Sequence, residues 1–192
     1  ARGASGVIHV TGGKLTTYRV MAKQVVDIAE KRLATDFGIR AKEGCITDRL
    51  ALEGGAGGGL HAEVAQEVEA ATTLLNLGDE EASCLLTTYG TGYTRLINLV
   101  KSDLALGKRI CPTLPYLWAE LPHAVQNEMA LSLCDFMILR THIICEDPSQ
   151  GMDQAREVAE KMGALLGWSA EEKERQLGAY THEVDLTRKF RK

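Results

Sequence analysis

The stretch Gly6–Arg19, GVIHVTGGKLTTYR, decides how the start of this chain should fold. Its first part, Val7–Thr11, is a short β-branched run that predicts a buried strand. The pair Gly12-Gly13 breaks this strand with a tight turn, and apolar residues at helical spacing follow over about residues 15–33. The stretch therefore predicts a strand, a glycine turn and a helix, in that order.

This geometry aims the start of a helix at a ligand. Glycine has no Cβ, so the backbone can come close to a bound group. The free N–H groups of the first helical turn and the helix dipole favour anionic or electron-rich groups. Lys14 adds a positive charge there, and Thr16 and Thr17 add hydroxyls. The alternative is an ordinary connection whose glycines only make the turn, since neither GxxxxGK[ST] nor GxGxxG is present.

The composition is that of a globular protein with a helical bias. Of 192 residues, 45% are apolar, 25% charged and only 5% aromatic, and the length allows one sizeable domain, alone or with an appendage. The net charge of −4 offers no basic surplus for nucleic acid. No apolar run approaches the roughly 18 residues that span a bilayer. Residues 1–5 lack a starting Met and an apolar signal core, so we expect a piece of a longer chain.

The five cysteines are scattered, odd in number and never spaced as CxxC. This pattern favours reduced thiols in a cytoplasmic setting over a zinc or iron–sulfur site. We expect each thiol to act as a small apolar filler, above all Cys134 and Cys145, which lie in apolar runs.

The chain divides by pattern into three parts. Residues 1–36 form the strand–helix segment, 37–59 a linker, and 60–192 a helical domain. The linker is glycine-rich at 54–59, which allows either a phosphate-cradling loop or a flexible surface connection. We favour the connection, because no Lys-Ser/Thr pair follows the glycines and the next residues are acidic.

Helical periodicity dominates the third part. It predicts helices over about residues 60–77, 79–89, 93–106, 123–140, 152–166 and 170–187. Asp79 is the predicted cap of the second of these, and Ser169 with Glu172 forms a capping box for the last. The connection 107–122 is broken by three prolines but rich in apolar residues, so we expect it to lie against the core.

Charges inside the longest apolar helix, 123–140, need partners, because an unpaired buried charge is costly. We expect Asp135 and Arg140 to be paired, with each other or with neighbouring helices. Glu128 and Asp135 share a predicted face, which leaves acid–base catalysis as an alternative to a structural role, although we favour the structural one. The basic tail 188–192 is either a solvated helix end or a contact for a membrane surface or partner.

Four stretches carry a resemblance to a known family: VTGGKLTTYRVMA (10–22), LLTTYGTGYTRLINL (85–99), ELPHAVQNEMALSLCDFMILRTHI (120–143) and MGALLGWSAEEKERQLGAYTHEV (162–184). They resemble FAD-dependent glycerol-3-phosphate dehydrogenases, which are flavoproteins of the D-amino-acid-oxidase type. The first resembles the end of the FAD domain, and the others resemble the C-terminal helical domain. One departure is Leu139, which stands where the family has the first of two arginines before Thr141. The scattered cysteines resemble the aerobic, quinone-reducing type more than the anaerobic type.

The resemblance implies a mainly α fold: a C-terminal helix bundle preceded, at residues 1–36, by the last strand–helix unit of an FAD domain. It implies an intact enzyme that oxidises sn-glycerol 3-phosphate to dihydroxyacetone phosphate and passes electrons through FAD to quinone. The implied partners are the N-terminal FAD and substrate domains of the same chain, a possible homodimer, quinone and the membrane surface. The implied location is cytoplasmic, peripheral to the inner membrane. The competing hypothesis is a helical interaction, dimerisation or membrane-docking module without a catalytic role.

The resemblance also implies a cofactor site, made of Gly12, Gly13, Lys14, Leu15, Thr16 and Thr17 against the pyrimidine edge of the flavin. Lys14 could also hold the substrate phosphate, whereas Arg19 is expected to be structural. No catalytic residue is assigned with certainty, and no metal site is expected. Because the dinucleotide-binding fingerprint is missing, the chain alone is expected neither to hold FAD nor to be active.

Overall fold

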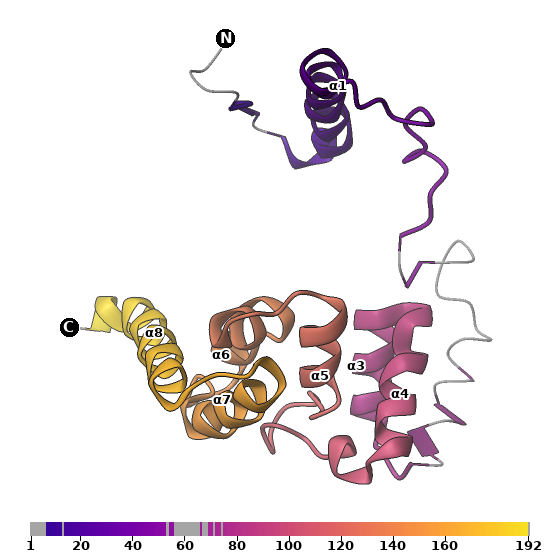
Figure 1. The fold of residues 1–192 in the computed structure, drawn as a ribbon. Helices are drawn as coiled ribbons and strands as arrows, with labels where there is room; N and C mark the ends of the chain where they lie inside the picture. Colours follow the sequence, from indigo (N-terminus) through magenta and orange to yellow (C-terminus); the bar gives the residue numbers. More distant parts are fainter. Residues whose placement is uncertain are drawn as a thin grey trace. The chain divides into compact units, whose positions relative to one another are not determined.

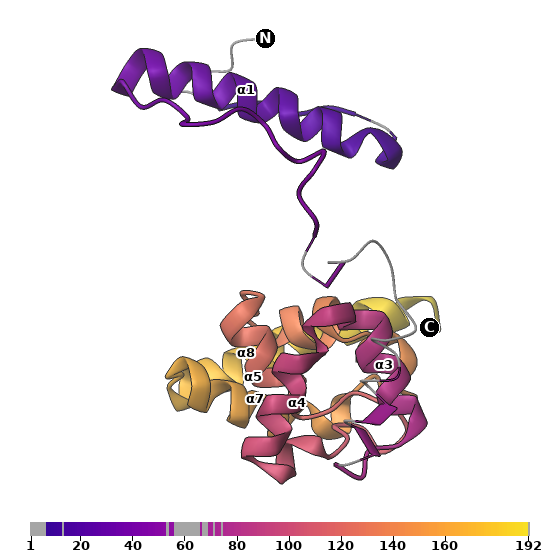
Figure 2. The same ribbon diagram turned by 90° about the vertical axis from the view of Figure 1, so that its right-hand side faces the viewer.

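The computed structural model describes residues 7–12, 14–52, 54–55, 66, 69–70, 72–73 and 75–191. The chain divides into two compact units, Ala1–Ala51 and Leu52–Lys192. Helices dominate both units, which confirms the predicted mainly α class (Figures 1 and 2). In the described part of the chain the one β pairing is an isolated antiparallel bridge between Arg109 and Leu117.

The first unit is built on one long helix. A 3-10 turn, Leu15–Thr17, leads into α1, Tyr18–Phe37. The helix ends at Gly38, whose φ of 69° is a left-handed conformation that favours glycine and closes the helix. The predicted helix therefore exists and runs about one turn further than its periodicity indicated.

The strand predicted at the start of the chain is not formed in the described residues 7–12, which have no regular secondary structure. Val7 and Val10 are each 53% exposed. A strand is stable only when a neighbouring strand takes up its hydrogen bonds and another layer covers its apolar face. The described residues supply neither, so the β-branched pattern alone does not make the strand.

The apolar side chains of α1 are largely uncovered. None of its residues is buried, and several large ones are exposed, namely Tyr18, Val20, Val26, Ile28, Leu33 and Phe37. Helices in proteins owe most of their stability to packing of an apolar face. Within the described residues, the first unit therefore has no hydrophobic core of its own.

The second unit is a bundle of short and medium helices. They are α3 (Asp79–Tyr89), α4 (Tyr93–Ser102), α5 (Glu120–Asn127), α6 (Ile143–Glu146), α7 (Met152–Leu166) and α8 (Ala170–Arg188). A π-helix, Asp135–Arg140, stands between α5 and α6. Helices α7 and α8 pack together, and α5 packs against α7 (Figure 1). Of the predicted helix 60–77, residues 66, 69–70 and 72–73 are described and helical, whereas the described residues 75–77 are not helical, so the helix ends before them.

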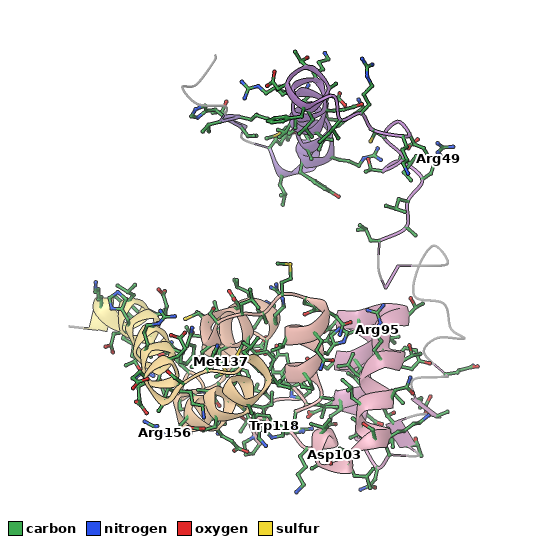
Figure 3. All side chains as sticks on the ribbon, viewed as in Figure 1. Arg49, Arg95, Asp103, Trp118, Met137 and Arg156 are labelled. Carbon is green, nitrogen blue, oxygen red and sulfur yellow. The ribbon has the colours of Figure 1, made fainter. Side chains whose placement is uncertain are left out.

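Two buried clusters hold this bundle together. The larger lies among α5 to α8 and includes Phe136 and Met137, the latter labelled in Figure 3. The smaller joins α3 and α4 to Leu117 in the connection 108–119. Trp118 in the same connection is also buried, so this proline-rich segment lies against the core as predicted.

Local signals gave the last two helices correctly. Helix α7 has the predicted bounds, and its end at Gly167 is left-handed with φ 71°. The Ser169 hydroxyl accepts a hydrogen bond from the amide of Glu172 at 3.1 Å, which caps α8. Pro122 falls in the first turn of α5, where its missing N–H costs nothing, and not in the connection as predicted.

The predicted single helix over 123–140 is wrong. Helix α5 ends at Asn127, and Met129 adopts a φ of 56°. A new helical start follows, in which the Ser132 hydroxyl accepts from the amide of Asp135 while the Asp135 carboxylate accepts from the amide of Ser132 at 2.9 Å. This reciprocal cap is a local alternative to continuous helix that apolar periodicity does not reveal.

Gly151 offers a test of packing at a left-handed turn. A Cβ here would lie 2.5 Å from Met137 Cε and 2.6 Å from Ile143 Cγ2, whereas one on Gly167, which has the same φ of 71°, would meet nothing within 4 Å. Both Gly→Ala changes strain the backbone, but only Gly151→Ala also overpacks the core. We expect Gly151→Ala to lower the free energy of unfolding by about 1–3 kcal/mol more than Gly167→Ala in urea denaturation. Equal losses would show that the core at Gly151 yields freely.

Candidate functional site

The residues predicted to bind a cofactor share one turn at the start of the first helix. Lys14 has an extended backbone (φ −116°, ψ 116°), and the chain enters the 3-10 turn at Leu15. Lys14, Leu15, Thr16 and Thr17 are all exposed, and Leu15 is 85% exposed. The structure thus brings these four side chains together on an accessible turn. Gly13 lies outside the described residues.

Hydrogen bonds within this turn are few. The hydroxyl and the amide of Thr17 both donate to the carbonyl of Lys14, at 2.9 and 3.1 Å. Within the described part of the chain, the amides of Lys14 and Leu15 donate no hydrogen bond. Amides at a helix start that lack a partner are suited to an electron-rich ligand. Thr17 holds the turn through its two hydrogen bonds, and Lys14 and Leu15 are exposed on it.

Gly12 is constrained by the helix that follows. A Cβ at Gly12 would lie 2.2 Å from Met21 Cε and 2.7 Å from Met21 Sδ. The Met21 side chain therefore folds over Gly12. The glycine allows this close approach between the turn and α1, in addition to the ligand approach that the sequence predicted.

Arg19 lines a surface cavity of about 250 Å³ together with Val20, Lys23, Cys45, Thr47 and Asp48. Lys23 pairs with Asp27 at 2.8 Å, one helical turn along. The hydrogen bond between Cys45 and Thr47 lowers the pKa of the thiol. The cavity lies between α1 and the segment that follows it.

The cysteines are not uniform fillers. Cys111 is buried and Cys84 is partly buried, and burial raises the pKa of each thiol to about 11. Cys134 is partly buried as well, but Cys45 and Cys145 are exposed. The filler prediction is therefore wrong for these two, because the apolar run around Cys145 turns one face to water.

A buried carboxylate that the sequence did not single out joins α3 to α5. Glu120 is 1% exposed, and its Oε1 accepts from the amide of Leu117 at 2.7 Å. Its Oε2 accepts from the hydroxyl of Tyr89 at 2.8 Å. Burial raises the pKa of Glu120 to about 7. Its only sequence signal was an acid between apolar residues in YLWAELPHAV.

The network continues through His123 to the π-helix. The ring of His123 stands edge-on to Tyr89, with centroids 5.3 Å apart, and its Nε2 lies 3.6 Å from Glu128 Oε1. Glu128 in turn pairs with Arg140 at 3.4 Å. A cavity of about 130 Å³ lies beside these side chains. Residues of the stretches 85–99 and 120–143 are thus joined in one polar cluster.

The predicted partners of Asp135 and Arg140 exist, but the two do not pair with each other. Arg140 forms an ion pair with the carboxylate of Glu128 and donates a hydrogen bond to the Glu128 carbonyl. The Asp135 carboxylate accepts hydrogen bonds from the amides of Leu131 and Ser132. Glu128 and Asp135 do not share a helix, so the acid–base pair on one helix face is wrong. Among the described residues, no group of three or more His, Cys, Asp or Glu side chains is arranged to hold a metal ion. Among the described helices, none combines the length and apolarity that crossing a bilayer requires.

The Glu120 carboxylate should make the stability of the helical unit depend on pH. Its pKa of about 7 in the folded state lies above its ordinary value of 4.5. Glu120 therefore stabilises the fold fully below pH 4.5, and this stabilisation is lost as the pH rises to about 7. We expect the melting temperature of Glu120→Gln, relative to that of the wild type, to rise from pH 5 to pH 7. Above pH 7 this difference should stay constant. The gain corresponds to at most about 1.4 kcal/mol per pH unit.

Glu146→Gln is the matched control for this pH series. Glu146 accepts the hydroxyl of Tyr116 at 2.9 Å but is exposed. Its replacement removes a tyrosine–carboxylate hydrogen bond without removing a buried carboxylate. Parallel pH profiles for Glu120→Gln and the wild type would contradict the assignment of the titration to Glu120.

Comparisons with known proteins agree on one family. A family model for the C-terminal domain of alpha-glycerophosphate oxidase matches residues 45–173. The chain is 31% identical to an aerobic glycerol-3-phosphate dehydrogenase of Staphylococcus epidermidis, with 96% of this chain and 32% of that protein covered. It is 32% identical to a glycerol-3-phosphate dehydrogenase 2 of Mycobacterium tuberculosis, with 95% and 30% covered. The chain thus spans about a third of the length of these curated relatives.

A solved structure is also similar. It is the glycerol-3-phosphate dehydrogenase from Bacillus halodurans complexed with FAD, which matches with a TM-score of 0.71 and 26% sequence identity. The match covers 90% of this chain and 34% of that one. The architecture described above is therefore that of a known flavoenzyme segment.

Proposed function

The chain belongs to the family of the C-terminal domain of alpha-glycerophosphate oxidase, and from this membership we propose that it is the C-terminal part of an FAD-dependent glycerol-3-phosphate dehydrogenase. The intact enzyme oxidises sn-glycerol 3-phosphate to dihydroxyacetone phosphate and delivers the electrons to quinone at the membrane surface. The observation that carries the proposal is the exposed turn Lys14–Thr17. The relatives of the chain are named as glycerol-3-phosphate dehydrogenases, which supports the same activity. Its partners are the N-terminal FAD and substrate domains of the same chain.

The turn at Lys14 suits the electron-rich edge of a flavin. The amides of Lys14 and Leu15 donate no hydrogen bond to another described residue, and Lys14 is exposed. Thr16 adds an accessible hydroxyl, and Gly12 keeps the turn close to α1. These groups supply N–H donors and positive charge without any carboxylate in the turn. The chemical fit is to a group that gains negative charge.

The turn at Lys14 and Leu15 would hold the flavin of FAD, which would supply a hydride acceptor for the oxidation of the substrate. The residues of this chain act by stabilising charge: the amides of Lys14 and Leu15 donate to electron-rich oxygen, and the Lys14 ammonium offsets negative charge on the cofactor or on the substrate phosphate. Thr17 holds the peptide between Lys14 and Leu15, and with it the amide of Leu15, through its two hydrogen bonds to the Lys14 carbonyl. Donors already oriented before the reaction need no reorganisation during it.

The test of the proposed function uses the full-length protein. It should purify yellow, and anaerobic addition of sn-glycerol 3-phosphate should bleach the flavin absorption, whereas glycerol should not. Transfer of the electrons to a soluble quinone analogue restores the absorption. A flavin that glycerol 3-phosphate leaves oxidised would overturn the proposed substrate.

The 192-residue chain by itself should be colourless. Its cofactor-facing part is one turn and one helix, whereas a dinucleotide also needs a site for its adenosine half. We expect no flavin absorption band to remain with the chain after gel filtration in the presence of excess FAD. A band that co-elutes with the protein would contradict this division of the cofactor site.

An interaction module remains the second candidate for the helical unit. Met129, Leu131 and Leu139 are 76%, 55% and 62% exposed on the segment around the π-helix. Large exposed apolar side chains on one short segment favour a contact with another surface, such as a second copy or a membrane-facing partner. Light scattering of the full-length enzyme with Leu131 and Leu139 replaced by serine would separate dimerisation from the catalytic role.

A further inference from the structure

Two glycines that are far apart in sequence meet in the helical unit. Gly54 lies before α3, and Gly90 lies in the turn between α3 and α4. The amide of Thr91 donates to the carbonyl of Gly54 at 3.1 Å. Both glycines have positive φ, 80° at Gly54 and 51° at Gly90. A backbone hydrogen bond therefore ties the segment before α3 to the α3–α4 turn.

The contact leaves no room for a side chain on either glycine. A Cβ on Gly90 would lie 2.1 Å from the carbonyl oxygen of Gly54, and a Cβ on Gly54 would lie 2.5 Å from the carbonyl oxygen of Tyr89. Both clashes are with backbone atoms, which cannot swing aside as the end of a side chain can. Each glycine is thus required twice, once by its φ and once by this close approach.

The α3–α4 turn is itself held firmly from the other side. The hydroxyl of Tyr89 donates to buried Glu120, and the ring of Tyr89 stands against His123. Tyr93, just after the turn, is 6% exposed. The turn therefore presents a fixed backbone surface to Gly54. On the other side of the contact, the amide of Gly55 donates to the carbonyl of Leu52 at 2.9 Å, which closes a tight turn in that segment.

We propose that the α3–α4 turn is an anchor for the chain at Gly54 and Gly55. The anchor fixes the point at which the chain arriving from the first unit joins the helical unit. The connection between α1 and the helical unit then consists of residues 38–51, because Leu52, Gly54 and Gly55 belong to the helical unit. This role is independent of flavin and of the proposed reaction.

Adjacent glycines provide a matched test. Gly54→Ala meets both the positive φ and the clash, whereas a Cβ on Gly55 would meet only the Leu52 carbonyl at 3.4 Å, at a φ that is not positive. Amide hydrogen exchange of Thr91 is the readout. We expect the Thr91 amide to be protected in the wild type and in Gly55→Ala, and to exchange at least about tenfold faster in Gly54→Ala.

The amide of Leu96, inside α4, reports whether the effect is local. It should stay protected in both variants, because the anchor does not carry the core. Gly90→Ala, on the α3–α4 side of the contact, should likewise speed the exchange of the Thr91 amide. Gly92→Ala is its control and should leave Thr91 protected, since a Cβ on Gly92 would lie 3.9 Å from its nearest neighbour atom, Tyr89 Cβ. Fast exchange of Thr91 in the wild type, equal exchange in the Gly54 and Gly55 variants, or loss of Leu96 protection in Gly54→Ala would each overturn the proposal.

Discussion

Phe136→Ala is expected to lower the free energy of unfolding of the helical unit by about 3–5 kcal/mol. Phe136 is 0% exposed and lies in the larger buried cluster, within the π-helix Asp135–Arg140. Removing the ring deletes buried apolar surface and leaves a cavity that the surrounding helices fill only in part. Urea denaturation followed by far-UV circular dichroism measures the loss as a lower midpoint at an unchanged slope.

Phe190→Ala is the control, because it makes the same change on a side chain that is 79% exposed. Surface substitutions usually change stability by no more than about 0.5 kcal/mol. A loss below about 1 kcal/mol for Phe136→Ala would mean that the π-helix segment does not pack against the bundle in solution.

Lys14→Met in the full-length enzyme is expected to lower kcat/KM for glycerol 3-phosphate. The loss of transition-state stabilisation should be about 2–4 kcal/mol, the scale of removing one donor from an oxyanion site. Methionine keeps the length of the side chain and removes its charge. Thermal stability should change little, because Lys14 is exposed and a cation at a helix start does not gain from the dipole. Steady-state kinetics and a thermal melt of the same preparation measure both quantities.

The control for Lys14→Met is Lys31→Met, which makes the same change near the other end of α1 on another exposed lysine. It should leave kcat and KM at wild-type values. Wild-type kinetics in Lys14→Met would end the assignment of this residue, while leaving the membership of the family intact. A purely structural Lys14 would instead alter the melting temperature and leave turnover unchanged.

Local chemistry explains which parts of the fold were predictable. Helix α7 and the start of α8 are marked by residues whose effect is nearly independent of the rest of the chain: Gly151, Gly167 and Ser169. The break after Asn127 depends on a cap that Ser132 and Asp135 form with each other, and it overrides a continuous apolar pattern. The strand over residues 7–11 failed for the opposite reason, since its formation depends on neighbours that the described residues do not include.

The same distinction applies to the candidate site. The clustering of Lys14, Leu15, Thr16 and Thr17 follows from their adjacency, so the sequence could predict it. The Glu120 network could not be predicted, because Tyr89 at the end of α3 and Glu120 at the start of α5 are far apart in sequence and meet only through tertiary packing. Buried polar pairs of this kind leave almost no periodic trace in a sequence.

The absence of any buried residue in α1 means that cooperativity is unevenly distributed along the chain. The helical unit, with its two buried clusters, can unfold as one all-or-none system. A helix without buried contacts follows helix–coil statistics, in which turns fray from the ends and reform within microseconds. A surface that covered Val20, Val26 and Ile28 would therefore order α1, and the free energy of that contact would include the entropy of fixing the helix.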